Sequence, residues 1–167
     1  IVVQQLWFMK ESDIGFDKEQ ILLVNMNTEA NQKFETIKSE LQKQSMIRGV
    51  TASGQRLGNN FHQGGFKVKS DTGVVSITPS NVNVDYDYLN VYGMEIKEGR
   101  GFSKDNSWDI NGLAYVINES LAKELKLKET IGTKAGHDWY HNDSLGSIIG
   151  VVKDFNFNSL HYKVNTL

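Results

Sequence analysis

The sequence contains no cysteine, which excludes disulfide bonds, thiolate catalysis and cysteine-based zinc sites. Proline occurs once, as Pro79, and there is no internal repeat or low-complexity tract, so we expect no flexible linker between separate domains. No stretch approaches the roughly 20 consecutive apolar residues that a membrane-spanning helix needs. The chain also has no excess of positive charge, because it contains 18 basic and 20 acidic residues and its net charge is −2. We therefore exclude nucleic-acid binding.

Motifs for phosphate binding and for nucleophilic catalysis are absent as well. The glycines of residues 99–101 and 132–136 lack the Gly-Lys-Ser/Thr order that a phosphate-binding loop places before a helix, and there is no Gly-x-Ser-x-Gly elbow. His137 and His141 are four residues apart, but the neighbouring Gly, Asn, Asp and Ser residues indicate an exposed turn and not a metal site. We therefore predict no catalytic residue, no cofactor-binding residue and no metal ligand.

The remaining composition is that of an ordinary globular protein. The chain has 167 residues, of which 39% are hydrophobic and 23% are charged. This balance predicts one compact domain or two small lobes. Residues 1–3 lack both an initiator methionine and the layout of a signal peptide, so we expect the chain to be part of a longer protein.

Apolar periodicity predicts the elements of the N-terminal third. Residues 1–9 have a helical pattern, and the apolar run at residues 21–24 is typical of a strand covered on both faces. Thr28 is suited to cap a helix with one buried stripe. That stripe consists of Ala30, Phe34, Ile37 and Leu41. Residues 49–53 are predicted as a second strand, which gives a βαβ-like unit.

The rest of the chain alternates short strands with short helices. The predicted elements are a hairpin within residues 66–84 with its turn at 71–73, a helix capped by Asp85 or Asp87 and ended by Gly93, a strand at 113–117, a helix capped by Asn118, and a strand at 147–157. Between them, Gly99 and Gly101 permit a turn around Arg100, whose guanidinium is suited to hold a loop by bidentate hydrogen bonding.

The most informative segment, residues 148–161, reads IIGVVKDFNFNSLH and joins a buried-strand pattern to a polar and aromatic tail. Further segments precede it in a fixed order: QLWFM at 5–9, DIGFDKEQIL at 13–22, VDYDYL at 84–89, EGRGFS at 98–103 and VINESLA at 116–122. The series resembles the extracytoplasmic core domain of MacB/FtsX-type ABC transporter permeases, especially the version common in Bacteroidetes-like bacteria. Because several motifs recur in one order, a chance match of simple composition is a poor explanation.

The resemblance implies an α+β fold with two lobes. A mixed-sheet, porter-like lobe is built from both chain ends, residues 18–82 and 146–167. A smaller, sabre-like α/β lobe, residues 83–145, is inserted between them. Residues 1–17 form a membrane-proximal stalk in this scheme, and a terminal helix packed on the core is the alternative for residues 1–9.

The resemblance also implies a non-catalytic role on the periplasmic side of a bacterial inner membrane. ATP is bound and hydrolysed by a separate cytoplasmic ATPase subunit or domain. This domain then relays the resulting movement to a periplasmic substrate or partner, as in the export of a peptide, antibiotic or lipoprotein. The expected partners are the protein's own transmembrane helices, the ATPase, a periplasmic adaptor or the cargo, and a second copy in a homodimeric transporter.

Two groups of side chains are candidates for these roles. Coupling to the membrane helices is assigned to residues near both chain ends, namely Trp7, Phe16, Phe155, Phe157, Leu160 and His161. Partner or cargo contact is assigned to Trp108, Trp139 and Phe61, because aromatic side chains contribute a large contact area at low entropy cost. Burial in the core is the alternative for each of these three.

Two other classes of protein stay open from the sequence alone. The first is a free periplasmic module that binds a small ligand in a cleft between two lobes. The second is a hydrolase that uses His137, His141 and nearby acidic residues.

Overall fold

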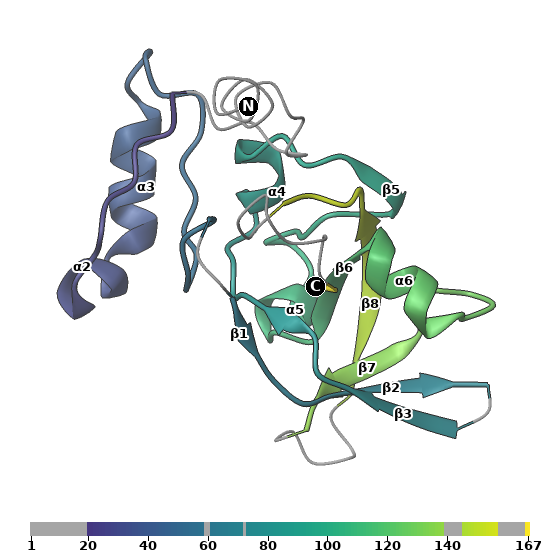
Figure 1. Ribbon diagram of the computed structural model, residues 1–167. Helices are drawn as coiled ribbons and strands as arrows, with labels where there is room; N and C mark the ends of the chain where they lie inside the picture. Colours follow the sequence, from purple (N-terminus) through teal and green to yellow (C-terminus); the bar gives the residue numbers. More distant parts are fainter. Residues whose placement is uncertain (1–19, 59–60, 72, 139–144, 157–165) are drawn as a thin grey trace, which may run out of the picture.

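A twisted sheet forms the body of the molecule, and two short helices stand to one side of it (Figure 1). The structure is a computed structural model that describes residues 20–58, 61–71, 73–138, 145–156 and 166–167. The helices are α2 (Thr28–Gln32), α3 (Phe34–Gln42), α4 (Tyr88–Val91), α5 (Ser107–Ile110) and α6 (Glu119–Leu125). The strands are β1 (His62–Gln63), β2 (Phe66–Ser70), β3 (Gly73–Ile77), β4 (Ser80–Asn81), β5 (Ile96–Gly99), β6 (Ala114–Asn118), β7 (Lys134–His137) and β8 (Gly146–Val152).

In the described part of the chain the main sheet has six strands of mixed direction. Five of them follow the order β3-β2-β7-β8-β5 with antiparallel pairing, and β6 pairs with β8 in parallel. β8 therefore has three neighbours, and most of its residues are buried. A continuous apolar sequence is expected for a strand covered on both faces, which explains the IIGVV run. The mixed sheet with few helices confirms the predicted α+β class.

Two clusters of buried apolar residues make up the core. The first contains Leu57, Phe61, Tyr88, Leu89, Tyr92, Met94, Val152 and Phe155. The second contains Phe66, Val68, Ile117, Leu121, Ala135, Ile148 and Val151. β8 contributes residues to both clusters, so the segment that carries the strongest sequence motif also lies at the centre of the core.

Local signals placed several elements correctly. The hairpin of β2 and β3 pairs Ser70 with Gly73 at its turn, as predicted. Gly93 follows α4 with a φ of 61°, a left-handed conformation that glycine adopts without a side-chain clash. The Asn118 side chain accepts a hydrogen bond from the Leu121 amide at 3.0 Å and so caps α6. These three predictions are confirmed.

The predicted βαβ unit at the N-terminal end is wrong in its strands. Residues 21–24 form no strand, and Leu22 and Val24 are 86% and 71% exposed. Residues 49–53 contribute one isolated bridge, between Ser53 and Val84. The physical reason is that a strand needs a hydrogen-bonded neighbour, and the described residues offer neither segment a full one.

The helix of this unit also differs from its prediction. It is split into α2 and α3 at Lys33, and the cap is the side chain of Asn27, which accepts from the Ala30 amide at 2.9 Å, and not Thr28. Leu41, which was predicted to be buried, is 39% exposed. The last predicted strand also ends earlier, because β8 stops at Val152.

The strands of both predicted lobes lie in the same sheet. The range predicted for the porter-like lobe contributes β2, β3 and β8, and the range predicted for the inserted lobe contributes β5, β6 and β7. The two-lobe boundaries stay a prediction, and residues 1–17 lie outside the described part of the chain. Among the described residues, no helix has the length and apolar character that crossing a membrane requires.

Candidate partner-contact site

The loop between β5 and β6 presents a short helix, α5, whose exposed apolar residues make it the best candidate contact surface. The loop begins with a sharp turn at Gly99, where φ is +72° and an added Cβ would lie 2.2 Å from the Ile149 carbonyl oxygen. This close approach lets the Arg100 amide donate to the same carbonyl at 2.9 Å. The start of the loop is therefore fixed to β8 and only glycine fits there.

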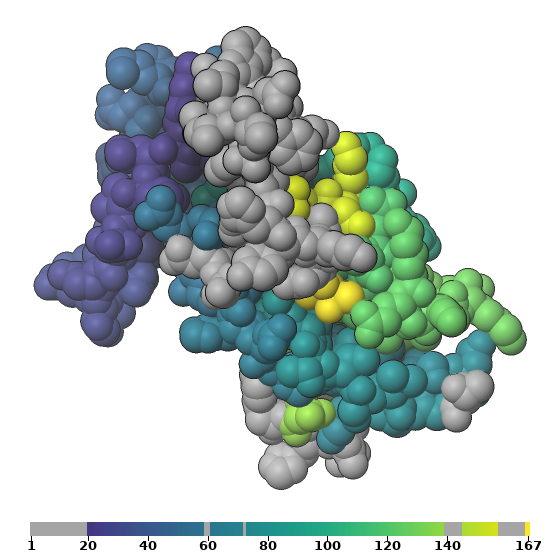
Figure 2. Space-filling model, in the orientation of Figure 1, coloured from purple at the N-terminus to yellow at the C-terminus, as the bar shows by residue number. Residues whose placement is uncertain are grey.

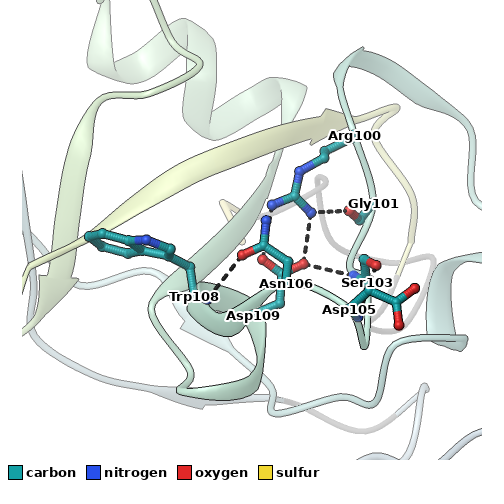
Figure 3. A network of polar contacts seen from close by, with 7 residues as sticks. All are labelled: Arg100, Gly101, Ser103, Asp105, Asn106, Trp108 and Asp109. Carbon is teal, nitrogen blue, oxygen red and sulfur yellow. Dashed lines mark hydrogen bonds and ion pairs between the residues drawn. The ribbon is translucent and has the colours of Figure 1, made fainter.

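An ion pair holds the loop in shape (Figure 3). Arg100 Nη1 donates to Asp109 Oδ2 at 2.7 Å, and Arg100 Nη2 donates to Asp109 Oδ1 at 3.0 Å. The Ser103 amide also donates to Asp109 Oδ2, at 2.7 Å, and Arg100 Nη1 reaches the Gly101 carbonyl at 2.9 Å. This bidentate arrangement confirms the loop-holding role predicted for Arg100.

The two charges of this pair differ in their environment. The Asp109 side chain is fully buried, whereas 42% of the Arg100 side chain is exposed. The hydrogen bonds from Arg100, assisted by the Ser103 amide, hold the pKa of Asp109 below its usual value in spite of burial. Asp109 is therefore an ionised anchor at neutral pH, and Arg100 closes the loop over it.

α5 itself is capped and carries its apolar side chains outward. The Asn106 side chain accepts from the Trp108 amide at 3.0 Å, and the Leu113 amide donates to the Trp108 carbonyl at 2.9 Å. Trp108 is 45% exposed and Ile110 is 56% exposed. Asp109 lies between these two residues in the sequence, and its side chain points into the protein. The ion pair that fixes Asp109 therefore also keeps Trp108 and Ile110 at the surface.

A lysine from the sheet completes this surface. Lys134 Nζ lies 4.5 Å from the centroid of the Trp108 ring, within the range of a cation–π interaction. The same Nζ donates to Ser147 Oγ at 3.0 Å, and this hydrogen bond links β7 to β8. We call Trp108, Ile110 and Lys134 the α5 surface. An indole with a cation over its ring, and an exposed aliphatic side chain on the same short helix, suit contact with a partner protein or peptide.

The other two predicted contact residues do not join Trp108 on this surface. Phe61 is 5% exposed and packs in the first core cluster, which is the core alternative for this residue. Trp139 lies outside the described residues. Neither Ile110 nor Lys134 was predicted from the sequence. An apolar residue two positions after Trp108 was visible, but nothing local linked Lys134 to a tryptophan 26 positions earlier.

Of the predicted coupling residues, Phe155 is the one that the structure describes. It is 2% exposed and belongs to the first core cluster. Trp7, Phe16, Phe157, Leu160 and His161 lie outside the described residues.

Asp154, next to Phe155, ties the end of β8 to α6. Its carboxylate accepts from the Ser120 amide and the Ser120 hydroxyl, both at 2.8 Å, and its own amide donates to Glu119 Oε2 at 3.2 Å. Asp154 therefore satisfies a backbone amide at a helix N-terminus.

The chain beyond residue 165 returns to the body. The Asn118 amide donates to the Leu167 carbonyl at 3.0 Å, and the Leu167 amide donates to Asn118 Oδ1 at 3.1 Å. The Ser80 amide donates to the Thr166 carbonyl at 3.1 Å. The same asparagine thus caps α6 and holds Leu167.

Within the described ranges no three His, Cys, Asp or Glu side chains form a group that could hold a metal ion. His137 lies in β7, where burial lowers its pKa against the opposing effects of the Gly65 backbone and Asp138, and His141 lies outside the described residues.

Comparisons with solved structures found chains of similar fold. One is a domain of a protein described as a permease from Porphyromonas gingivalis, with a TM-score of 0.52 at 14% sequence identity over 78% of this chain and 50% of that one. Another is the periplasmic region of MacB from Actinobacillus actinomycetemcomitans, with a TM-score of 0.49 at 18% identity over 84% of this chain and 67% of that one. A third is the extracellular domain of the noncanonic ABC-type transporter YknZ from Gram-positive bacteria, with a TM-score of 0.46 at 18% identity over 78% of this chain and 58% of that one.

Sequence comparisons gave a different outcome. No family model matches the chain, and no curated protein sequence matches it. The chain spans between half and about two thirds of the length of the three structures above. The likeness to the Porphyromonas gingivalis domain is therefore one of fold, and that fold is the one that the ordered sequence motifs predict.

Proposed function

We propose that this chain is a non-catalytic extracytoplasmic domain of an ABC transporter permease, placed on the periplasmic side of a bacterial inner membrane. The observation that carries the proposal is the fold shared with the Porphyromonas gingivalis permease domain over 78% of the chain. The ordered motifs that end in residues 148–161 support it independently, because they depend on the amino-acid sequence alone.

In this proposal the domain couples movement of the membrane helices to a periplasmic substrate or partner. ATP is hydrolysed on a separate cytoplasmic ATPase, and the transmembrane helices of a dimeric permease transmit the change. Such a relay needs a stiff body, since movement would otherwise dissipate in loops. β8 supports this requirement, because it has three neighbours in the sheet and belongs to both core clusters.

We further propose that the α5 surface contacts the periplasmic partner or cargo. Trp108 and Ile110 are exposed apolar residues on a helix that is held in place by the ion pair between the buried Asp109 and the partly exposed Arg100. A fixed aromatic group loses little conformational entropy on binding, which favours its use in recognition. Peptide or lipoprotein cargo and a periplasmic adaptor all offer apolar groups that fit this surface.

The placement of the domain is testable by cysteine labelling, because this chain has no cysteine of its own. Met46, which is 92% exposed, is replaced by cysteine in the full protein, and spheroplasts are treated with a membrane-impermeant maleimide. The proposal predicts the same labelling of M46C before and after lysis. The matched variant A135C, at a fully buried position, should react only after denaturation. Labelling of M46C that required lysis would place the domain in the cytoplasm and end the proposal.

The contact role of the α5 surface is tested by exchanging Trp108 for alanine in the full transporter. Export and partner binding should both fall, because the largest exposed side chain of the surface is removed. V74A is a suitable control, since Val74 is a 62% exposed apolar residue on β3. If export and partner binding were equal in W108A and V74A, the contact role would be wrong.

A further inference from the structure

The helix α3 is attached to the rest of the molecule in an unusual way. Every residue of α3 is described, and the only buried one is a lysine, Lys38. Phe34 and Ile37 are half-buried, and Leu41 is exposed. Figure 2 shows the purple and blue part of the chain, which includes α2 and α3, projecting at one side of the teal and green body. A helix that is docked mainly by apolar packing would bury an apolar stripe instead.

Lys38 reaches two carboxylates that lie far away in sequence. Its Nζ lies 2.5 Å from Asp85 Oδ2 and 2.6 Å from Asp87 Oδ2. The side chains of Lys38 and Asp85 are 9% and 12% exposed, whereas that of Asp87 is 44% exposed. The lysine is thus a nearly buried cation between one nearly buried and one accessible anion.

Other groups hold Asp85 in position to receive the lysine. The Thr51 hydroxyl and the Asp87 amide both donate to Asp85 Oδ1, the latter at 3.1 Å. The Asp85 amide donates to the Ala52 carbonyl at 3.0 Å. One carboxylate oxygen is therefore used by the body, and the other is left for Lys38.

The contact of Lys38 with the two aspartates determines the position of α3, because the charged lysine needs these partners. Burial alone would lower the pKa of Lys38, but its hydrogen bonds to Asp85 and Asp87 and their charges outweigh burial and raise it. Lys38 therefore stays charged, and a buried charge without a partner is strongly unfavourable. Hydrogen bonds are also directional. They therefore restrict the orientation of α3 relative to the body more than apolar contact does.

The two aspartates lie just before core residues in the sequence. Asp87 is the residue before α4, and the first two residues of α4, Tyr88 and Leu89, are buried in the first core cluster. On the other side, α2 and α3 follow the N-terminal residues that were predicted as the membrane-proximal stalk. Lys38 therefore lies between the N-terminal helices and the core.

We propose that Lys38, Asp85 and Asp87 form a polar joint that docks α3 on the body and passes movement of the N-terminal helices into α4. The proposal rests on the coupling function proposed above. It also predicts that α3 can be released while the core stays folded, because no apolar side chain of α3 is buried in either core cluster.

Hydrogen exchange of the 167-residue chain tests the docking directly. In K38M the helix propensity is nearly unchanged, so faster exchange reports loss of the joint and not of helix formation. Residues 34–42 should exchange at least about tenfold faster in K38M, while residues 146–152 are unchanged. K33M is the matched control, because Lys33 pairs with Glu29 on the same pair of helices with side chains that are 65% and 76% exposed. It should leave exchange as in the wild type.

Two further variants separate the joint from local effects. D85N should release α3 in the same way as K38M, although the substitution lies 47 residues away in sequence. D87N is a milder change, because Asp87 makes no side-chain capping bond to α4 and is partly exposed. It should accelerate exchange of α3 severalfold, and it keeps the test decisive if K38M or D85N fails to fold. Unchanged exchange of residues 34–42 in every folded variant would overturn the joint.

The relay is tested in the full transporter. K38M should lower export at an unchanged rate of ATP hydrolysis, whereas K33M should lower neither. Export equal to wild type in K38M would overturn the relay. Failure of the joint or of the relay can be distinguished from failure of the proposed function. Hydrogen exchange is measured without membrane or nucleotide, and the M46C labelling reports the placement of the domain whether or not α3 is docked.

Discussion

Replacement of Asp109 by asparagine is the most informative single change in the α5 loop. The side chain keeps its shape but loses its charge and one of its two acceptor oxygens. In the wild type these oxygens accept two hydrogen bonds from Arg100 and one from the Ser103 amide. In D109N the amide group must turn its NH₂ toward one of these donors, which leaves a donor facing a donor in a buried site.

The size of the effect follows from burial. Breaking a buried ion pair by removing one partner costs about 3–5 kcal/mol, and hydrogen bonds to a charged group contribute about 1.5–3 kcal/mol. Arg100 is 42% exposed and can be hydrated when its partner is lost, and asparagine keeps one acceptor, so the lower range applies. We expect D109N to lower the free energy of unfolding by about 2 kcal/mol. For a chain of this length this corresponds to a melting temperature lower by about 4–8 °C.

Denaturant and thermal unfolding of the purified chain measure this loss, and D105N is the matched control. Asp105 lies in the same loop with an exposed side chain, so its substitution should change the stability by less than about 0.5 kcal/mol. If D109N were no less stable than D105N, the ion pair would not hold the loop and the reasoning would be wrong.

The pH dependence gives a second readout of the same pair. Because Arg100 lowers the pKa of folded Asp109, its contribution to stability is complete above the unfolded pKa of about 3.9 and is lost as the pH falls through the folded value. The stability difference between wild type and D109N should therefore be constant from about pH 7 to 5 and shrink below about pH 4. A difference that grew on acidification would contradict this assignment.

Two further predictions concern the frame around β8. G99A should be far more destabilising than G132A, although both glycines have positive φ. A Cβ at residue 99 would lie 2.2 Å from the Ile149 carbonyl oxygen, whereas nothing lies within 4 Å of a Cβ at residue 132. Equal melting temperatures of the two variants would show that the turn at Gly99 relaxes freely. D154A should cost about 1–2 kcal/mol by denaturant unfolding, since the Ser120 amide and hydroxyl both lose their acceptor; a loss below about 0.5 kcal/mol would mean that water replaces the carboxylate.

The parts of the fold that the sequence predicted are those set by local chemistry. The turn of the β2–β3 hairpin, the end of α4 at Gly93 and the Asn118 cap each depend on residues only a few positions apart. Residues 21–24 show the opposite case. Their apolar run is typical of a strand, but a strand forms only where another segment supplies hydrogen bonds, and periodicity carries no information about that partner.

The same division holds for the candidate sites. The loop-holding role of Arg100 was predictable because glycines on both sides permit a turn around a guanidinium that can form two hydrogen bonds at once, whereas its partner Asp109 was not predicted. The contact of Lys38 with Asp85 was missed because it spans 47 residues, and both aspartates were interpreted as helix caps. One signal was present, since Lys38 is four residues after Phe34 and three before Leu41 and so falls on the predicted buried stripe.

The central claim is that this chain is part of an inner-membrane permease, and an immunoblot of fractionated native cells tests it most directly. An antibody raised against the chain is used on cytoplasmic, periplasmic and membrane fractions. The account predicts a band much heavier than the 18.8 kDa of this chain, in the inner-membrane fraction and released only by detergent. A soluble band near 18.8 kDa would contradict it and favour a free periplasmic binding module.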